Sequence, residues 1–535
     1  MQRLRHWLAG LVLLCPGLAY PASGPDITSA GASIYHNGEL PSGEALTARL
    51  QGGTLISGRQ FSCVRCHKRS ALGTSEAGLV VPPLTSERLF SPIVLQRKEL
   101  YGTRSEGQTT RPAYNRELLA RAIREGVDAS GRVLHPAMPR YALDDQALNA
   151  LSQYLENTHE TIAPGVTDTN IHFATIITPD VPDEQRTLLH AMQTQFVKEK
   201  NANTRYEPNR VKNPPWHKEW HYRHWRRWNL HTWVLDGEPD SWPQQLANYY
   251  QQQPVFAVLG GVSYQDWRPI HNFCEQQALP CLFPSLQQVP QEPSVYNLYF
   301  SPGIALEARA FARYLKQHPD IRQIHQVIGE TPAAHEAAKS LRDALRERPL
   351  KITDLPLSDS HLEKSSDTTP LTVYWLSAEE LSGLSSTFDE TPQTHPAVFS
   401  STLLEMTFDR IPPALQADSI ILHPYMAPKD KKRLLRSGVW MNSRQLELSR
   451  ERIQGDSYFA LTLMGDALMH IRSHFNRDYL IERIEHMTEN MLEVSLYPHL
   501  SLGPGQRFAA KGCYVLPLAQ LKDRSTLDDQ YWIIP

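Results

Sequence analysis

Two cysteines and a histidine stand within five residues in the first part of the chain, in the sequence Cys63-Val64-Arg65-Cys66-His67. This C-x-x-C-H spacing is typical of the attachment site of a c-type haem. The two thiols can add across the vinyl groups of a porphyrin, and the adjacent imidazole then lies against the iron. A surface disulfide or half of a zinc site is the alternative, but no second C-x-x-C occurs to complete four zinc ligands.

A methionine further along the chain offers the sixth ligand that an iron held by His67 would still lack. Met138 stands between His135-Pro136 and Pro139, shortly before an expected helix. Ligation by His67 and Met138 favours the ferrous state and raises the reduction potential. The alternatives are that Met138 is a core side chain, or that His135 is the ligand instead.

The stretch between these two motifs contains prolines and basic residues. A backbone carbonyl near Pro82-Pro83 is expected to accept the Nδ1–H of His67, which leaves Nε2 for the iron. The basic residues indicate a solvated loop, or cations that meet haem propionates or an acidic redox partner. These residues are Arg97, Lys98, Arg104 and Arg111.

The order of motifs through residues 28–160 resembles class I cytochromes c, above all the domains that serve periplasmic dehydrogenases. It runs G-x-x-I-Y-x-x-G from Gly31, then C-x-x-C-H, P-P-L, M-P and L-x-x-L-x-x-Y-L. The resemblance implies a small all-α domain with one covalent haem c. It assigns the thioethers to Cys63 and Cys66 and the axial ligands to His67 and Met138. The long insert between the two axial ligands departs from the family.

Length and composition favour a globular protein of several domains. With 535 residues, 41% hydrophobic and 21% charged, two or three domains are expected. The net charge of −3 gives no case for a nucleic-acid partner.

The first 22 residues are typical of a signal peptide. Arg3 and Arg5 precede a short apolar run at 7–14, and small residues follow, with cleavage expected after Ala19 or Ala22. A lipid anchor at Cys15 is not expected, because the residue follows Leu14 where a small residue would be needed. No later segment has the roughly 18 apolar residues of a membrane span. We therefore expect a periplasmic protein without a transmembrane segment.

Beyond a linker expected at 161–170, the pattern changes to alternating strands and helices. Such alternation favours parallel sheets covered by helices. Strands are expected at 173–177, 255–259, 279–283, 324–328, 371–375 and 420–422. Helices are expected at 183–198, 264–277, 304–317, 332–347 and 457–475.

Four local sequences in residues 171–535 resemble type I periplasmic binding proteins of the branched-chain amino acid class. They are L-G-G-V-S at 259–263, L-P-C-L-F-P-S at 279–285, Y-F-S-P at 299–302 and D-S-Y-F-A at 456–460. The resemblance implies a two-lobed α/β region with a ligand cleft at the carboxyl ends of its strands. The matching cleft positions are Ser263, Tyr264 and Ser285, although the serines could instead cap helices or close turns. The sequence identifies no acidic residue for a ligand's ammonium group, so a docking scaffold remains the alternative.

Residues 216–228 are unusually rich in Trp, His and Arg. If this segment is helical, His217, His221 and His224 share a face, which is compatible with a metal site. An aromatic and cationic docking surface and plain packing are the alternatives.

Three cysteines remain outside the haem motif and the signal peptide. Cys274 is expected to end a helix and Cys281 to start the next strand, so a short-loop disulfide is expected, with buried thiols as the alternative. Cys513 is expected to be free.

These features predict a monohaem electron carrier and not an enzyme. Both axial positions of its iron are filled, and a two-haem peroxidase would need a second C-x-x-C-H. The expected partner is a redox protein, either a periplasmic dehydrogenase or another cytochrome, with the second region used for docking or ligand sensing. The alternative is a solute-binding protein for a small metabolite in which the haem is a secondary redox gate.

Overall fold

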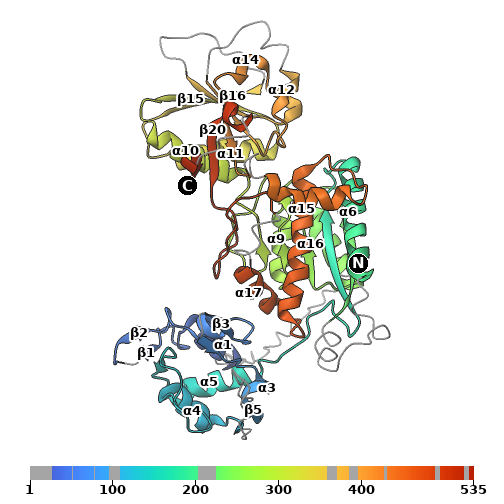
Figure 1. The fold of residues 1–535 in the computed structure, drawn as a ribbon. Coiled ribbons are helices and arrows are strands. Elements are labelled where there is room, and N and C mark those ends of the chain that lie inside the picture. The colour runs from blue at the N-terminus through green and yellow to red at the C-terminus, as the bar shows by residue number, and fades with distance from the viewer. Residues whose placement is uncertain are drawn as a thin grey trace, which may run out of the picture. The chain divides into compact units, whose positions relative to one another are not determined.

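The computed structural model describes residues 27–50, 52–76, 79–95, 109–202, 225–357, 370–384, 396–426, 431–487, 495–522 and 529–535. The chain divides into two units, Met1–Glu160 and Thr161–Pro535 (Figure 1). Within the described ranges, no helix combines the length and the apolar character that crossing a bilayer requires.

Helices dominate the first unit, but it is not all-α. Its helices are α1 (Ile27–Asn37), α2 (Cys63–His67), α3 (Ser86–Leu89), α4 (Arg116–Arg124) and α5 (Asp145–Glu156). Its strands are β1 (Thr47–Arg49), β2 (Leu55–Ser57), β3 (Thr74–Glu76), β4 (Leu79–Val81), β5 (Ile93–Leu95), β6 (Thr109–Arg111) and β7 (Arg140–Tyr141).

The strands of the first unit form one small sheet and two hairpins. The sheet has the order β2-β1-β7, while β3 pairs with β4 and β5 with β6, all antiparallel. The expectation of an all-α domain is therefore wrong. Strands of two or three residues are too short to produce a readable alternation in the sequence, and both hairpins lie in the insert after His67.

The core of the first unit is built around the crossing of α1 and α5. Ile34 and Tyr35 from α1 and Leu148 and Leu151 from α5 are buried together. The two helices approach so closely at Gly31 that an added Cβ atom would lie 2.2 Å from the carbonyl oxygen of Ala150. Only a glycine permits this approach without displacing the backbone of α5.

The second unit contains two lobes, each built on a seven-stranded sheet. In the first lobe all pairings are parallel, in the order β13-β11-β8-β10-β12-β14, with β9 paired to β8. These strands are β8 (Asn170–Ile177), β9 (Arg227–Val234), β10 (Ala257–Leu259), β11 (Val262–Ser263), β12 (Cys281–Leu282), β13 (Ser285–Leu286) and β14 (Asn297–Leu298).

Helices from two distant parts of the chain cover this first sheet. They are α6 (Asp183–Ala202), α8 (Trp242–Gln252), α9 (Arg268–Gln276), α15 (Lys431–Asn442), α16 (Glu451–Ile471) and α17 (Arg477–Met487). Helix α16 contacts α6, β10 and β13, so the late part of the chain returns to the first lobe (Figure 1). The buried run Phe173–Ile177 in β8 explains this double cover, because a central parallel strand needs apolar packing on both faces.

The second lobe has the strand order β16-β15-β17-β18-β19-β20-β21, in which β20 is antiparallel to both of its neighbours and the other pairings are parallel. Its strands are β15 (Gln323–Ile328), β16 (Lys351–Pro356), β17 (Leu371–Trp375), β18 (Ala397–Ser400), β19 (Ile420–His423), β20 (Cys513–Pro517) and β21 (Trp532–Ile533). Its helices are α10 (Ile304–Gln317), α11 (Pro332–Ala344), α12 (Ala378–Gly383), α14 (Pro413–Gln416) and α18 (Leu518–Lys522). Short 3-10 helices occupy Pro239–Ser241, Phe408–Arg410 and Asp529–Tyr531.

The segment expected as a linker, residues 161–170, lies against the second unit. The amide of Ala163 donates to the carbonyl oxygen of Phe475, and the amide of His172 donates to that of Gly165. Strand β9 was not expected, because no strand was predicted between residues 198 and 255, and the segment 216–228 was considered only for the case that it is helical.

Candidate functional site

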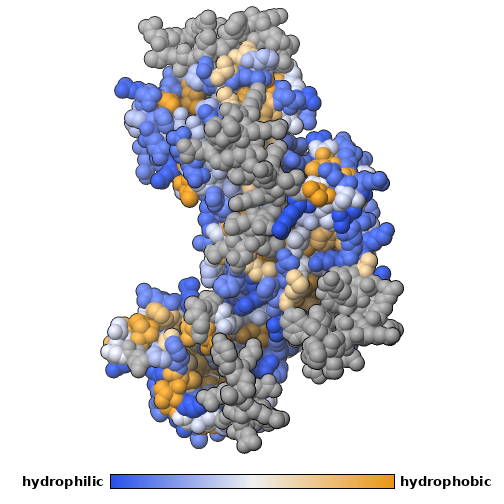
Figure 2. Space-filling view, in the orientation of Figure 1, coloured by the Kyte–Doolittle hydropathy of each residue, from blue (hydrophilic) through white to orange (hydrophobic). Residues whose placement is uncertain are grey.

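A cavity of about 710 Å³ lies within the first unit, and the residues of both haem motifs line it. Cys63, Cys66, His67 and Met138 all border this space. Most of its remaining wall is apolar, and Figure 2 shows hydrophobic residues gathered on the visible face of this unit. The structure thus brings together four side chains that are spread over 76 residues of sequence.

The two thiols of the cavity are presented by the short helix α2. Ser62 precedes this helix with extended backbone, so Cys63 and Cys66 stand one turn apart on the same face. Cys66 is exposed, Cys63 is half-buried, and neither takes part in a disulfide. Desolvation raises the pKa of the Cys63 thiol to about 12.

His67 ends α2 and is buried at the cavity wall. Its Nδ1 atom lies 2.9 Å from the carbonyl oxygen of Pro82. Because a carbonyl oxygen can only accept, Nδ1 carries the proton and Nε2 keeps its lone pair. Burial lowers the pKa of His67 to about 4, so the imidazole is neutral, the form that binds metals.

The loop before β7 brings both candidate distal ligands to the cavity. Met138 and His135 both border the cavity, so their positions favour neither of them as the distal ligand. His135 is exposed, and its Nδ1 atom accepts a hydrogen bond from the amide of Ala137 at 3.2 Å. The hydroxyl of Tyr141, in β7, donates to the carbonyl oxygen of Phe61, which ties this loop to the start of α2.

These residues fit a covalently attached haem. The cavity offers an apolar wall for a porphyrin, two thiols at thioether spacing, a neutral imidazole and a thioether sulfur. Across the described ranges, no group of three or more His, Cys, Asp or Glu side chains could hold an ion.

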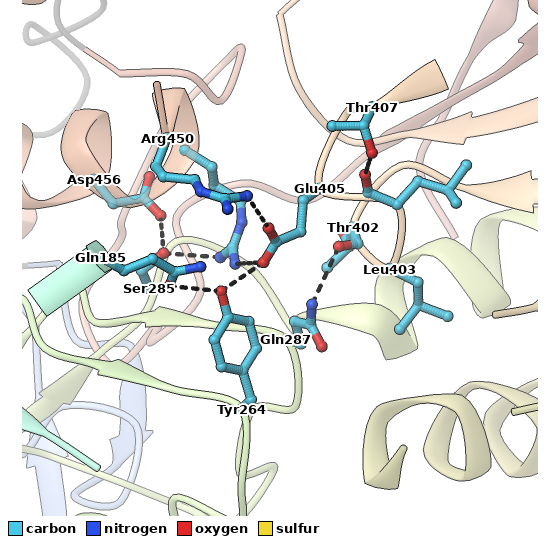
Figure 3. Close-up of polar contacts among 12 residues, drawn as sticks. Gln185, Tyr264, Ser285, Gln287, Thr402, Leu403, Glu405, Thr407, Arg450 and Asp456 are labelled. Carbon is cyan, nitrogen blue, oxygen red and sulfur yellow. Dashed lines mark hydrogen bonds and ion pairs between the residues drawn. The ribbon is translucent and has the colours of Figure 1, made fainter. Parts of the chain in front are cut away.

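A second polar cluster joins the two lobes of the second unit (Figure 3). Tyr264, which follows β11, donates its hydroxyl hydrogen to Glu405 at 2.5 Å and lies 2.9 Å from Gln185. Glu405, which follows β18 in the second lobe, also pairs with Arg450 at 3.3 Å. One carboxylate of the second lobe is therefore held by two residues of the first, and we call these three residues the clasp.

The inner part of this cluster lies on β13 and α16. The hydroxyl of Ser285 donates to Asp456 at 2.7 Å and accepts from Arg452 at 2.8 Å. Arg452 is 4% exposed, and its nearest carboxylate oxygen, on Glu405, is 4.0 Å away. The hydroxyl of Ser263, by contrast, donates to the carbonyl oxygen of Gln265 and accepts from its amide. This agrees with the alternative that the serine closes a turn.

On the side of the second lobe, Glu307 from α10 is fully buried. Its carboxylate accepts from the hydroxyl of Thr402 at 2.6 Å and from the amide of the same residue at 3.2 Å. Thr402 also lies 2.9 Å from the hydroxyl of Tyr425. Burial raises the pKa of both Glu307 and Asp456 to about 7.

Three polar atoms of this inner cluster are buried and have no hydrogen-bond partner among the described residues. They are Oε2 of Glu307, Oδ1 of Asp456 and Nε of Arg452. Such atoms are uncommon inside proteins and cost free energy when they stay unpaired. Neither Glu307 nor Asp456 was predicted as a site residue from the sequence.

The missed residues left only faint signals in the sequence. Glu405 comes shortly after a buried strand, where side chains of parallel sheets meet at one edge. Arg452 and Asp456 stand four apart on α16, a spacing that places both on one helix face but is also common on solvated helices.

The remaining predictions concern the other cysteines and two groups of basic or histidine residues. Cys274 and Cys281 form a disulfide between α9 and β12, and Cys513 is free and buried. His217, His221 and His224 lie outside the described residues, and so do Arg97, Lys98 and Arg104.

Comparisons with known proteins give matches among solved structures. A fatty acid ABC transporter substrate-binding protein from Thermomonospora curvata has 14% identity, with 68% of this chain and 96% of that chain covered and a TM-score of 0.47. A branched-chain amino acid ABC transporter protein from Thermus thermophilus with bound valine has 8% identity, covers of 65% and 94% and a TM-score of 0.48. A type 1 periplasmic binding protein from Bordetella pertussis has 12% identity, covers of 65% and 96% and a TM-score of 0.45.

No family model matches the chain, and no curated protein matches it. Identities of 8–14% do not transfer a ligand from these structures to this chain. None of the three is described as a haem protein.

Proposed function

We propose that this chain is an exported solute-binding protein whose first unit carries one haem c. The solute is a small polar metabolite held between the two lobes of the second unit. The observation that supports binding there is the set of unpaired buried atoms on Glu307, Asp456 and Arg452. A solute with donor and acceptor groups would give each of them a partner.

Entry of a solute between the lobes requires that the clasp opens. Tyr264 and Arg450 would release Glu405, and the freed groups could then turn to the solute. Ser285 would keep its place between Arg452 and Asp456, because both of its hydrogen bonds lie within the first lobe.

For the first unit, the support comes from the cavity. Cys63 and Cys66 would hold the haem covalently, with His67 and Met138 as axial ligands. A bound haem supplies one-electron transfer. The hydrogen bond from His67 to Pro82 orients the imidazole, and the apolar wall excludes water.

A second candidate function is electron relay, in which the lobes only dock a redox partner such as a periplasmic dehydrogenase or another cytochrome. The presence of both His67 and Met138 on one cavity favours it, because a haem with two protein ligands keeps no open position for a substrate. In this case the haem is the main functional group and the clasp stays closed.

Solute binding can be tested on the full-length protein with calorimetry and thermal shift. The panel contains amino acids, hydroxy acids, fatty acids, alcohols and polyols. We expect one class to bind, and we expect Asp456→Asn to weaken that binding at least tenfold. Asp343→Asn is the matched control, because Asp343 is exposed and, among the described residues, pairs with Lys339 on α11 and Arg346 just after it.

Two results would decide against solute binding. One is that no class in the panel binds to the wild-type protein. The other is that Asp456→Asn and Asp343→Asn bind the same compound equally well. Either result leaves electron relay as the better account, and rapid reduction of the protein by a partner purified with it would then support that function.

A further inference from the structure

The carboxylate of Glu405, in the second lobe, faces three donor side chains of the first lobe (Figure 3). It accepts a hydrogen bond of 2.5 Å from the hydroxyl of Tyr264 and pairs with Arg450 at 3.3 Å. Arg452 approaches the same carboxylate to 4.0 Å. A phenol hydroxyl and two guanidinium groups that converge on one point form a suitable environment for a bound carboxylate.

Both arginines also have an acidic neighbour within the first lobe. Glu184 lies 4.0 Å from Arg450, and its side chain is 64% exposed. Asp456 acts on Arg452 as an opposite charge, and the hydroxyl of Ser285 is hydrogen-bonded to both of them. The Nε–H group of Arg452 nevertheless has no hydrogen-bond partner among the described residues. The first lobe therefore keeps donor capacity for a further carboxylate at the position of Glu405.

The two arginines stand at the N-terminal end of α16. Arg450 directly precedes the helix, Arg452 belongs to its first turn, and no side chain caps this end. The helix dipole places positive partial charge there, so cationic side chains are unfavourable at this end unless an anion lies beside them. The arrangement is thus suited to an anion, and Glu405 provides one.

The backbone of Glu405 is strained in this position. Glu405 and the next residue, Met406, have φ angles of 46° and 62°. Residues with a side chain rarely adopt this left-handed conformation, because the Cβ atom crowds a carbonyl oxygen. Such residues persist where the surrounding contacts hold them. The carboxylate of Glu405 is therefore placed against the first lobe at a cost in backbone free energy.

Separation of the lobes would leave the three donors together without this anion. Glu405 follows β18 of the second lobe, whereas Tyr264 follows β11 and both arginines belong to the start of α16. A carboxylate that is part of a solute has the same charge and the same two acceptor oxygens as the Glu405 side chain. It can take the place of Glu405 on these donors without straining the backbone.

We propose that the solute carries a carboxylate, which displaces the carboxylate of Glu405 from Tyr264, Arg450 and Arg452. Glu405 is then a built-in competitor that keeps the clasp closed in the absence of solute. This inference rests on the proposed function, because it names the chemical class of the solute. Its rival is that Glu405 stays in place and receives a cationic group of the solute. The two accounts predict opposite effects when the charge of Glu405 is removed.

The test is calorimetry on the full-length protein with matched compounds. The panel contains small aliphatic, hydroxy and aromatic carboxylates, such as lactate and benzoate, each with its neutral amide and with the amine of the same skeleton. The variants are Glu405→Gln, which keeps the shape of the side chain, and Glu405→Ala, which removes its contacts. Glu184→Gln is the matched control, because Glu184 also lies near Arg450 but is largely exposed.

We expect carboxylates to bind, and their amides and amines not to bind. Both Glu405 variants should bind the carboxylate about tenfold more tightly than the wild-type protein, because the competing group is gone and a larger fraction of the protein is competent to bind. Glu184→Gln should bind it with an affinity close to that of the wild-type protein.

Carboxylate binding that is unchanged or weaker in both Glu405 variants would overturn the proposal. Binding of amines that is lost in Glu405→Gln would overturn it in favour of a cationic solute. If only neutral compounds bind, this inference fails while the solute-binding proposal stands. If no compound binds to the wild-type protein or to any variant, both fail.

Discussion

The Nδ1 atom of His67 lies 2.9 Å from the carbonyl oxygen of Pro82. This contact fixes both the tautomer and the orientation of the imidazole, because the carbonyl can only accept a hydrogen bond. The sequence predicted an acceptor near these prolines, and the structure confirms that hydrogen bond. The haem itself stays a proposal.

Replacement of Met138 by alanine tests the distal ligand. We expect Met138→Ala to keep covalent haem but to lose the weak long-wavelength ferric band that indicates an iron–sulfur bond, and to lower the potential. His135→Ala is the matched control, since His135 borders the same cavity. If the band is absent from the wild-type protein, or if only His135→Ala changes the spectrum, Met138 is not the ligand.

Gly31→Ala should destabilise the first unit. The added methyl group would lie 2.2 Å from the carbonyl oxygen of Ala150, so α1 and α5 would have to separate. Overpacking of this kind costs about 1–3 kcal/mol. Denaturant unfolding followed by a haem or aromatic signal of the first unit measures the loss. Gly383→Ala in α12 is the control, because its methyl group meets nothing within 4 Å, and an equal effect there would remove the packing explanation.

The disulfide between Cys274 and Cys281 should stabilise the second unit. The two cysteines are seven positions apart in the sequence. For a loop of this length, the chain-entropy estimate gives a stabilisation of about 2.5 kcal/mol. We expect the double variant Cys274→Ala, Cys281→Ala to unfold at lower denaturant concentration. A reducing agent should lower the stability of the wild-type protein to a similar degree and leave the double variant unchanged, and a reductant effect on both would point to another cause.

The stability of the second unit should depend on pH through Glu307 and Asp456. Burial raises the pKa of Glu307 from 4.5, and that of Asp456 from 3.8, to about 7. From about pH 4 to pH 7 the folded state therefore holds protons that the unfolded chain has released. The free energy of unfolding falls as the pH rises through this window, by at most about 1.4 kcal/mol per pH unit for each group.

The variants Glu307→Gln and Asp456→Asn isolate this contribution. Each should reduce the fall in stability between about pH 4 and pH 7, measured by urea unfolding at several pH values. Asp343→Asn is the control, since Asp343 is an exposed carboxylate of the same lobe as Glu307. A pH dependence that stays unchanged in Glu307→Gln and Asp456→Asn would contradict the assignment.

The sequence predicted the parts of the fold whose patterns are local. The apolar run that became β8 and the helical period that became α10 were both readable, and α10 has the expected bounds of residues 304–317. Strand β9 was missed, because the segment 216–228 was considered only for the case that it is helical and because its partner β8 is more than fifty residues earlier.

The site in the second unit depended on contacts that no local pattern reveals. Tyr264 meets Glu405 across 141 residues of sequence, and Ser285 meets Asp456 across 171. The resemblance pointed to Tyr264 and Ser285 as positions at the carboxyl ends of expected strands, but their acidic partners come from elements placed only by the tertiary fold. Ser263 shows the opposite case, since it occupies a matching position and only closes a turn.

The mass of the intact, exported protein tests the central proposal for the first unit most directly. We predict that the wild-type protein carries the added mass of one haem that survives denaturation, and that Cys63→Ala, Cys66→Ala removes it. A mature wild-type protein that shows no covalent haem would contradict the account, and the cavity beside His67 would then need another explanation.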